Sequence, residues 1–116
     1  MVKTHRDLQI WQKSMALVTK VYKEVENFPD YEKFGLTSQI RRSSVSIPAN
    51  IAEGFGRRSK KEFRRFLNIS MGSLFEIQTE LEVSYNLNYL DKDTFEMLYE
   101  DTREIERMMS SFISTL

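Results

Sequence analysis

The chain has 116 residues, 29% charged and 41% hydrophobic, which fits one soluble domain, residues 1–116, around a single core. It contains no cysteine, which excludes disulfides, thiolate metal sites and cysteine nucleophiles, and no apolar run long enough for a membrane span, so we expect a cytoplasmic protein without membrane contact. Its 17 Lys and Arg balance 17 Asp and Glu, and its four glycines and two prolines supply too few turns for an all-β fold.

The first predicted helix follows Asp7, whose carboxylate can accept hydrogen bonds from the free amides of a first turn. Apolar residues then recur at spacings of three and four, which places them on one face of an α-helix. They are Leu8, Trp11, Met15, Val18, Tyr22 and Val25. The stripe lasts to about Phe28 and Pro29 ends it, so this face is predicted to pack into the core.

The second predicted helix begins at Leu36 or the next residue, after a connector over residues 30–35. Its apolar or small positions are spaced by four and three: Leu36, Ile40, Ser44, Ile47, Ile51 and Phe55. Pro48 lies inside this pattern and removes one backbone hydrogen bond, but the stripe continues in phase beyond it, which predicts a kink and not a stop. Gly54 and Gly56 are predicted to close the helix.

A capping box from Ser59 to Glu62 opens the third predicted helix: the serine oxygen accepts from the Glu62 amide, and the glutamate reaches back to the serine amide. The helix is expected to end near Asn86 or Asn88, and its seam positions are Phe63, Leu67, Ser70, Leu74, Ile77, Leu81 and Ser84. Asp91 then caps a fourth helix with the apolar positions Phe95, Leu98, Thr102, Ile105, Met109, Phe112 and Leu116.

Four helices joined by short loops predict an all-α fold, an antiparallel up-down-up-down four-helix bundle with its second helix kinked at Pro48. The third and fourth helices carry apolar residues beyond one seam, namely Phe66, Ile69, Tyr85, Met97, Tyr99, Met108 and Ile113. A second buried surface would account for them, so we expect a homo-oligomer, although scattered exposed apolar residues are common on monomers.

The positive charge is concentrated in the middle of the chain. Residues 35–75 carry eight Lys and Arg against two Asp and Glu, whereas residues 76–116 carry three against ten. Six cations fall within nine residues: Arg57, Arg58, Lys60, Lys61, Arg64 and Arg65. At one end of a bundle they could bind the phosphates of a nucleic acid. The alternative interpretation is a solvated start of the third helix.

Two further arginines, Arg41 and Arg42, precede this cluster on the second helix. At about 1.5 Å per residue they lie about 24 Å of helix from Arg57, so they cannot share its phosphate. We expect one to face solvent and the other a neighbouring helix or subunit. The sequence leaves two interpretations of these arginines, a structural ion pair with a carboxylate and a contact with RNA.

Three polar residues, Ser46, Asn50 and Glu53, line one face of the same helix close to its apolar stripe. Buried polar groups need partners, so we interpret them as a structural polar network. In this network Glu53 is expected to bind Arg57, or Arg64 on the antiparallel third helix, and Ser46 to lie near Ser70.

No catalytic, cofactor or metal site is predicted. Glu96, Glu100 and Glu104 form an acidic ridge, but di-metal sites in bundles use Glu-x-x-His pairs, and the single histidine, His5, lies outside the core pattern. No nucleophile with an adjacent base and no phosphate-binding glycine loop is present.

Three stretches have a specific pattern: residues 36–54, LTSQIRRSSVSIPANIAEG; residues 61–67, KEFRRFL; and residues 72–76, GSLFE. Trp11-Gln-Lys and Phe28-Pro29 add to it. Through them essentially the whole chain resembles the four-helix bundle family of bacterial 23S rRNA intervening-sequence proteins. The motif of that family falls here on Arg41, Arg42, Ser46, Pro48, Asn50, Glu53 and Gly54.

The resemblance implies four-helix protomers that assemble as ring-like homopentamers, with no established enzymatic activity. The related accessory variability determinant protein of diversity-generating retroelements is a basic pentamer that engages nucleic acid and a reverse transcriptase. We therefore expect a non-enzymatic, homo-oligomeric binding module that associates with RNA or DNA through residues 57–65. The alternative is a protein-interaction scaffold that recruits a protein partner and binds no nucleic acid.

Overall fold

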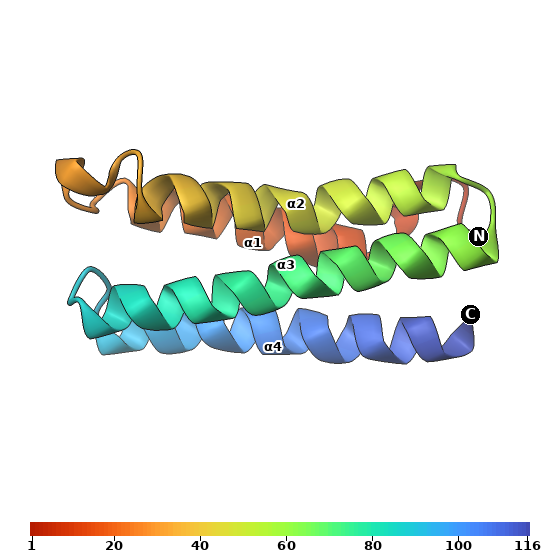
Figure 1. The fold of residues 1–116 in the computed structure, drawn as a ribbon. Coiled ribbons are helices and arrows are strands. Elements are labelled where there is room, and N and C mark those ends of the chain that lie inside the picture. Colours follow the sequence, from red (N-terminus) through yellow and green to blue (C-terminus); the bar gives the residue numbers. More distant parts are fainter.

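The computed structural model describes all residues, 1–116, and confirms the predicted all-α fold. Four long helices run antiparallel along one axis, and a short 3-10 turn precedes each of the first two (Figure 1). The elements in chain order are η1 (His5–Asp7), α1 (Gln9–Val25), η2 (Asp30–Glu32), α2 (Leu36–Gly56), α3 (Lys60–Asn86) and α4 (Lys92–Thr115). The bundle measures 42 × 25 × 20 Å, so it is one helix long and two helices across.

Each helix packs against two others, which makes a four-sided bundle. α2 lies between α1 and α3, α4 lies between α3 and α1, and the α2–α3 pair shares the most extensive contact. Both chain ends lie at the end of the bundle where α2 turns into α3 (Figure 1). The predicted up-down-up-down order is therefore confirmed.

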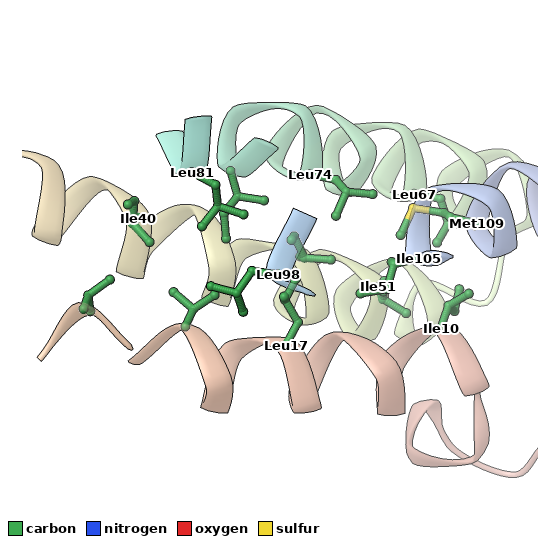
Figure 2. Close-up of a cluster of buried hydrophobic side chains, with 14 of the residues drawn as sticks. Ile10, Leu17, Ile40, Ile51, Leu67, Leu74, Leu81, Leu98, Ile105 and Met109 are labelled. Carbon is green, nitrogen blue, oxygen red and sulfur yellow. The ribbon is translucent and has the colours of Figure 1, made fainter. Parts of the chain in front are cut away.

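Aliphatic side chains from all four helices fill the centre of the bundle (Figure 2). The largest of those with less than 2% exposure are Leu17, Ile40, Ile47, Ile51, Leu67, Leu74, Ile77, Leu81, Leu98, Ile105, Met109 and Val21. Full burial of one such side chain stabilises the fold by roughly 1.5–3 kcal/mol, so this core fixes the positions of the helix ends. None of the helices combines the length and the apolar character needed to cross a membrane.

The buried face of α1 differs from the predicted one. Its buried residues are Ile10, Ser14, Leu17, Val21 and Val25, whereas Met15 and Tyr22 of the predicted stripe are exposed. Both sets satisfy the helical spacing, and the prediction chose the wrong one because it placed Met15 in the core of this helix and not Ser14. The Ser14 hydroxyl donates to the Ile10 carbonyl at 2.6 Å, which satisfies this polar group inside the core.

The start of α1 also differs from the prediction. Asp7 does not cap α1, because its carboxylate accepts from the backbone N–H groups of Lys3 at 2.8 Å and Thr4 at 3.0 Å. The bond from Thr4 is part of a capping box around η1, and both bonds lower the pKa of Asp7, the bond from Thr4 most strongly. α1 instead begins after Leu8, which offers no side-chain cap.

α2 runs from Leu36 to Gly56 with Pro48 inside it, as predicted. Gly54 does not end the helix. A Cβ atom on Gly54 would lie 2.6 Å from the Cβ of Phe66 and 3.1 Å from the ring of Phe63, so this glycine lets α2 and α3 approach closely. The helix ends two residues later, at Gly56.

The predicted caps of α3 and α4 are present. The Ser59 hydroxyl accepts from the N–H of Glu62 at 3.3 Å, and the Asp91 carboxylate accepts from the N–H of Thr94 at 2.7 Å. The predicted return bond from Glu62 is not formed, because this carboxylate binds Arg65 at 3.1 Å instead. The buried faces of α3 and α4 follow the predicted spacing.

Candidate nucleic-acid interface

Six cations, called the basic rim from here, gather at the end of the bundle where α2 passes into α3 (Figure 1): Arg57, Arg58, Lys60, Lys61, Arg64 and Arg65. The first two follow the last turn of α2, and the others lie on the first two turns of α3. Because Gly54 lets the two helices meet closely here, both groups belong to one surface.

Two members of the basic rim are held by carboxylates and by an aromatic ring. Arg57 pairs with Glu53 at 2.8 Å, and Arg65 pairs with Glu62 at 3.1 Å. The hydrogen bond from Arg65 lowers the pKa of Glu62. Both guanidinium groups lie over the ring of Phe66, at 5.0 and 4.5 Å from its centroid. Phe66, predicted to belong to an outward apolar surface, is therefore buried within its own chain.

The other four members, Arg58, Lys60, Lys61 and Arg64, are exposed, and none of them forms an ion pair. Arg58 has a φ angle of 57°, in the left-handed region that costs a residue with a side chain about 1–2 kcal/mol. The chain therefore places unneutralised charge, part of it on strained backbone, beside the start of α3.

Beside the basic rim lies a pocket of about 490 Å³ that the sequence analysis missed. Phe55 and Phe63 contribute aromatic rings in an edge-to-face pair with centroids 5.9 Å apart, and Lys3, Arg58 and Lys60 contribute cations. No carboxylate lines it. The one available signal was a phenylalanine just before the cationic run and another within it, but Lys3 could be placed here only by the fold.

Arg41 and Arg42 lie apart from the basic rim, as their spacing requires. The Arg41 guanidinium lies over the ring of Tyr22 on α1, 5.3 Å from its centroid, and its Nε atom is buried without a hydrogen-bond partner. Arg42 is exposed and borders a polar groove of about 430 Å³ between α2 and α3, with Glu76 and Glu80 on the opposite side. Neither arginine forms an ion pair within the chain.

The three residues of the expected polar network fall into two separate groups. The Asn50 amide donates to the carbonyl and the hydroxyl of Ser46, at 2.8 and 2.9 Å, and the Ser46 hydroxyl lies 2.8 Å from that of Ser73 on α3. The partner of Ser46 is thus Ser73, not Ser70, which donates to a backbone carbonyl of α2. Glu53 binds Arg57 and has no bond to Asn50.

Glu80 is a half-buried carboxylate between α2 and α3. Burial raises its pKa, the neighbouring Glu76 raises it further, and a hydrogen bond from Ser43 at 3.2 Å opposes both effects. Its Oε1 atom is buried without a partner. The acidic ridge on α4 is different, because Glu96, Glu100 and Glu104 each pair with a cation. No three His, Asp or Glu residues of residues 1–116 converge as metal ligands would.

Apolar side chains also remain on the outside of α3 and α4. Ile69 and Met97 are 42% and 44% exposed, and Tyr85, Tyr99, Met108 and Ile113 are half-buried. Tyr85 stacks on Phe95 with centroids 4.8 Å apart. Of the predicted outward set, only Phe66 is fully covered by its own chain.

Comparisons with known proteins match nearly the whole chain, both in sequence and in fold. A family model described as 23S rRNA-intervening sequence protein matches residues 6–111. A crystal structure of a protein of unknown function from the S23 ribosomal protein family of Bacteroides thetaiotaomicron is 29% identical, with 90% of this chain and 97% of that chain covered and a TM-score of 0.81. No curated protein matches the sequence.

Proposed function

The chain belongs to the 23S rRNA-intervening sequence protein family, and we propose that it is a non-enzymatic, homo-oligomeric binding module that associates with RNA through the basic rim. The observation that carries this proposal is the set of four exposed cations without an ion pair, Arg58, Lys60, Lys61 and Arg64. A cation that neutralises a phosphate releases condensed counterions, so such a set favours binding to a nucleic-acid backbone.

The position of these cations supports the same function. Positive charge beside the N-terminus of a helix opposes the helix dipole, at a cost of a few tenths of a kcal/mol per residue. Arg58 adds the cost of its left-handed backbone. Charges kept at positions that disfavour folding are characteristic of a functional surface.

The exposed apolar side chains on α3 and α4 support self-association. Ile69 and Met97 lie on different helices, and each would lose contact with water between two copies. In the ring-like pentamer that the family resemblance implies, the basic rim would repeat around the ring. Sedimentation equilibrium tests this: we expect a species several times heavier than 13.8 kDa, and a monomer at micromolar concentration would contradict it.

The RNA proposal is tested by fluorescence anisotropy of a labelled structured RNA at several salt concentrations. The test variant replaces Arg58, Lys60, Lys61 and Arg64 with alanine and keeps the two paired arginines. For the wild type, we expect log affinity to fall linearly with log salt. Each lost phosphate contact should reduce the magnitude of that slope by roughly 0.7–0.9, so the variant should lose both affinity and slope.

The matched control replaces Lys13, Lys20, Lys23 and Lys33, which removes the same charge from outside the basic rim. This control should bind RNA almost as the wild type does. Equal losses in both variants would mean that net charge, and not the basic rim, governs binding. No binding by the wild type even at low salt would reject the RNA function.

A protein-interaction scaffold is the second candidate. Tyr31 and Phe34, at the end of the bundle opposite to the basic rim, are 79% and 89% exposed. Aromatic residues exposed to this extent are typical of contact surfaces. This function would be favoured if RNA binding failed and replacement of both aromatics with serine abolished co-purification of one defined protein.

A further inference from the structure

The pocket beside the basic rim combines two chemical surfaces that phosphate binding alone does not require. The rings of Phe55 and Phe63 line it together with the cations Lys3, Arg58 and Lys60. Phe63 also contacts Phe112 on α4, with ring centroids 5.6 Å apart, so the aromatic surface is anchored to a third helix. A volume of about 490 Å³ lies within the roughly 300–1,000 Å³ of small-ligand sites.

We propose that this pocket takes one unpaired nucleotide of a single-stranded RNA, with the base against Phe55 and Phe63 and the phosphate at Arg58 and Lys60. The inference rests on the proposed RNA function and adds a preference to it. Aromatic side chains stack on unpaired bases of any sequence, while cations alongside follow the backbone. A duplex base is already stacked on its neighbours and cannot enter.

The charges around the pocket favour this occupant over a protein segment. Three cations and no carboxylate line it, so an anionic group is attracted and a cationic one is repelled. None of these three cations forms an ion pair within the chain. The aromatic rings would still face water if an isolated phosphate were bound, whereas a base would cover them.

Gly56 provides a way to fill the pocket without changing its charge. It lines the pocket, and a Cβ atom built on it would meet no atom within 4 Å. It ends α2 with a backbone conformation that residues with side chains also adopt. A leucine here should therefore occupy the space for the base without backbone strain. Gly72 on α3 is the matched control, because its Cβ position is equally open and lies outside the pocket.

The experiment compares wild type, Gly56→Leu and Gly72→Leu in anisotropy titrations with a short labelled oligouridine and with an RNA duplex of the same length. We expect the wild type to prefer the single strand. The affinity of Gly56→Leu for the single strand should be about tenfold lower than that of the wild type, because one stacked base contributes about that factor. Its affinity for the duplex and its salt slope should not change. Gly72→Leu should bind both RNAs as the wild type does.

The possible failures are distinguishable. If the wild type binds neither RNA, the proposed function itself is wrong. If the wild type binds both equally and Gly56→Leu changes nothing, RNA binding stands and the nucleotide pocket is rejected. Equal losses on both RNAs would also reject it. Should Gly56→Leu unfold, photocrosslinking of a 4-thiouridine oligonucleotide to the wild type decides: the crosslink is expected at Phe55 or Phe63, and a crosslink elsewhere overturns the inference.

Discussion

The two ends of the bundle carry opposite charge, although the protein as a whole is neutral. The half with the basic rim and both chain ends, residues 1–16, 47–72 and 104–116, has ten Lys and Arg against five Asp and Glu. The opposite half, residues 17–46 and 73–103, has seven against twelve. The balance is thus +5 and −5. Antiparallel helices have converted an asymmetry along the sequence into one along the molecular axis.

The two ends use their surplus charge differently. At the acidic end, the Asp91 carboxylate caps α4, and Glu32 accepts from the N–H of Leu36 at 3.2 Å and from the Tyr89 hydroxyl at 2.9 Å. At the basic end, Arg58, Lys60, Lys61 and Arg64 have no such partner. Two carboxylates at the acidic end therefore stabilise a helix end and a loop, while four cations at the basic end remain available to a ligand.

The backbone of the turns after α2 and after α3 differs in the same way between the two ends. Each contains a residue with positive φ, Arg58 at 57° and Asn88 at 64°. Asparagine adopts this conformation at a lower cost than arginine. The turn at the acidic end is thus built for stability, and the turn at the basic end keeps a cation at a cost in stability.

The largest effect is expected from Gly54→Ala, which disturbs the helix contact beneath the basic rim. The added Cβ would lie 2.6 Å from the Cβ of Phe66, which cannot rotate away, so α2 and α3 must separate. We expect a loss of about 1–3 kcal/mol of unfolding free energy in urea titrations, as for other overpacked sites. Gly56→Ala is the control, because its Cβ position is open, and it should unfold as the wild type does. Similar losses in both would show that the contact is not tight.

A smaller effect is expected from Asp91→Ala at the acidic end. It removes the cap of α4, so the thermal midpoint of unfolding should fall by a few degrees at neutral pH. The control is Asp93→Ala, which removes a carboxylate of the first turn that accepts no capping bond and should lower the midpoint by less. Backbone hydrogen bonding by Thr94 lowers the pKa of Asp91 below its ordinary 3.8.

The direction of that pKa shift gives the pH dependence. A carboxylate with a lowered folded-state pKa contributes stability above its ordinary pKa and loses it as the pH falls through the lowered value. The difference between wild type and Asp91→Ala should therefore be constant near neutrality and shrink below pH 3.8. A difference that did not depend on pH in this window would mean that the charge of Asp91 is not involved.

The smallest effect on stability is expected from Arg58→Gly, which should raise the unfolding free energy but lower the RNA affinity. Glycine relieves the left-handed backbone but is more flexible when unfolded, so the net gain in unfolding free energy should be below about 1 kcal/mol. RNA affinity should fall, because one cation of the basic rim is lost. Asn88→Gly should gain less stability and leave RNA binding unchanged. A variant more stable and still fully RNA-binding would remove Arg58 from the proposed site.

The sequence predicted α3 and α4 better than α1, for a physical reason. In α3 and α4 the seam residues repeat at heptad-like spacing along the whole helix, so positions such as Leu74 and Leu98 could be assigned to the core although further apolar residues lie beside the seam. In α1 two overlapping sets had helical spacing, and the true one contains Ser14. A buried serine needs a hydrogen-bond partner, which for Ser14 is the Ile10 carbonyl of its own helix, and spacing does not reveal such a partner.

For the candidate site, the sequence identified the cations but not their states. The run from Arg57 to Arg65 was evident in the sequence. Which of its members are neutralised depends on side-chain conformations: Arg65 lies over the ring of Phe66, and the Glu62 carboxylate binds Arg65 and not the Ser59 amide. The aromatic pocket requires the chain start to fold back beside the α2–α3 turn, a contact between residues far apart in sequence.

The small residues between α2 and α3 also bear on the order of folding. The hydrogen bonds from Ser46 to Ser73 and from Ser70 to Ile47 join α2 and α3 and span 27 and 23 residues of chain. By contrast, the bond from Lys20 on α1 to Asp101 on α4 spans 81 residues. Shorter loops cost less entropy to close, and serine and glycine have little rotamer freedom to lose. We expect the α2–α3 hairpin to form first, so that Ser70→Ala slows refolding in stopped-flow experiments while Ser14→Ala mainly speeds unfolding. The surface that carries the cations would then exist before the bundle is complete.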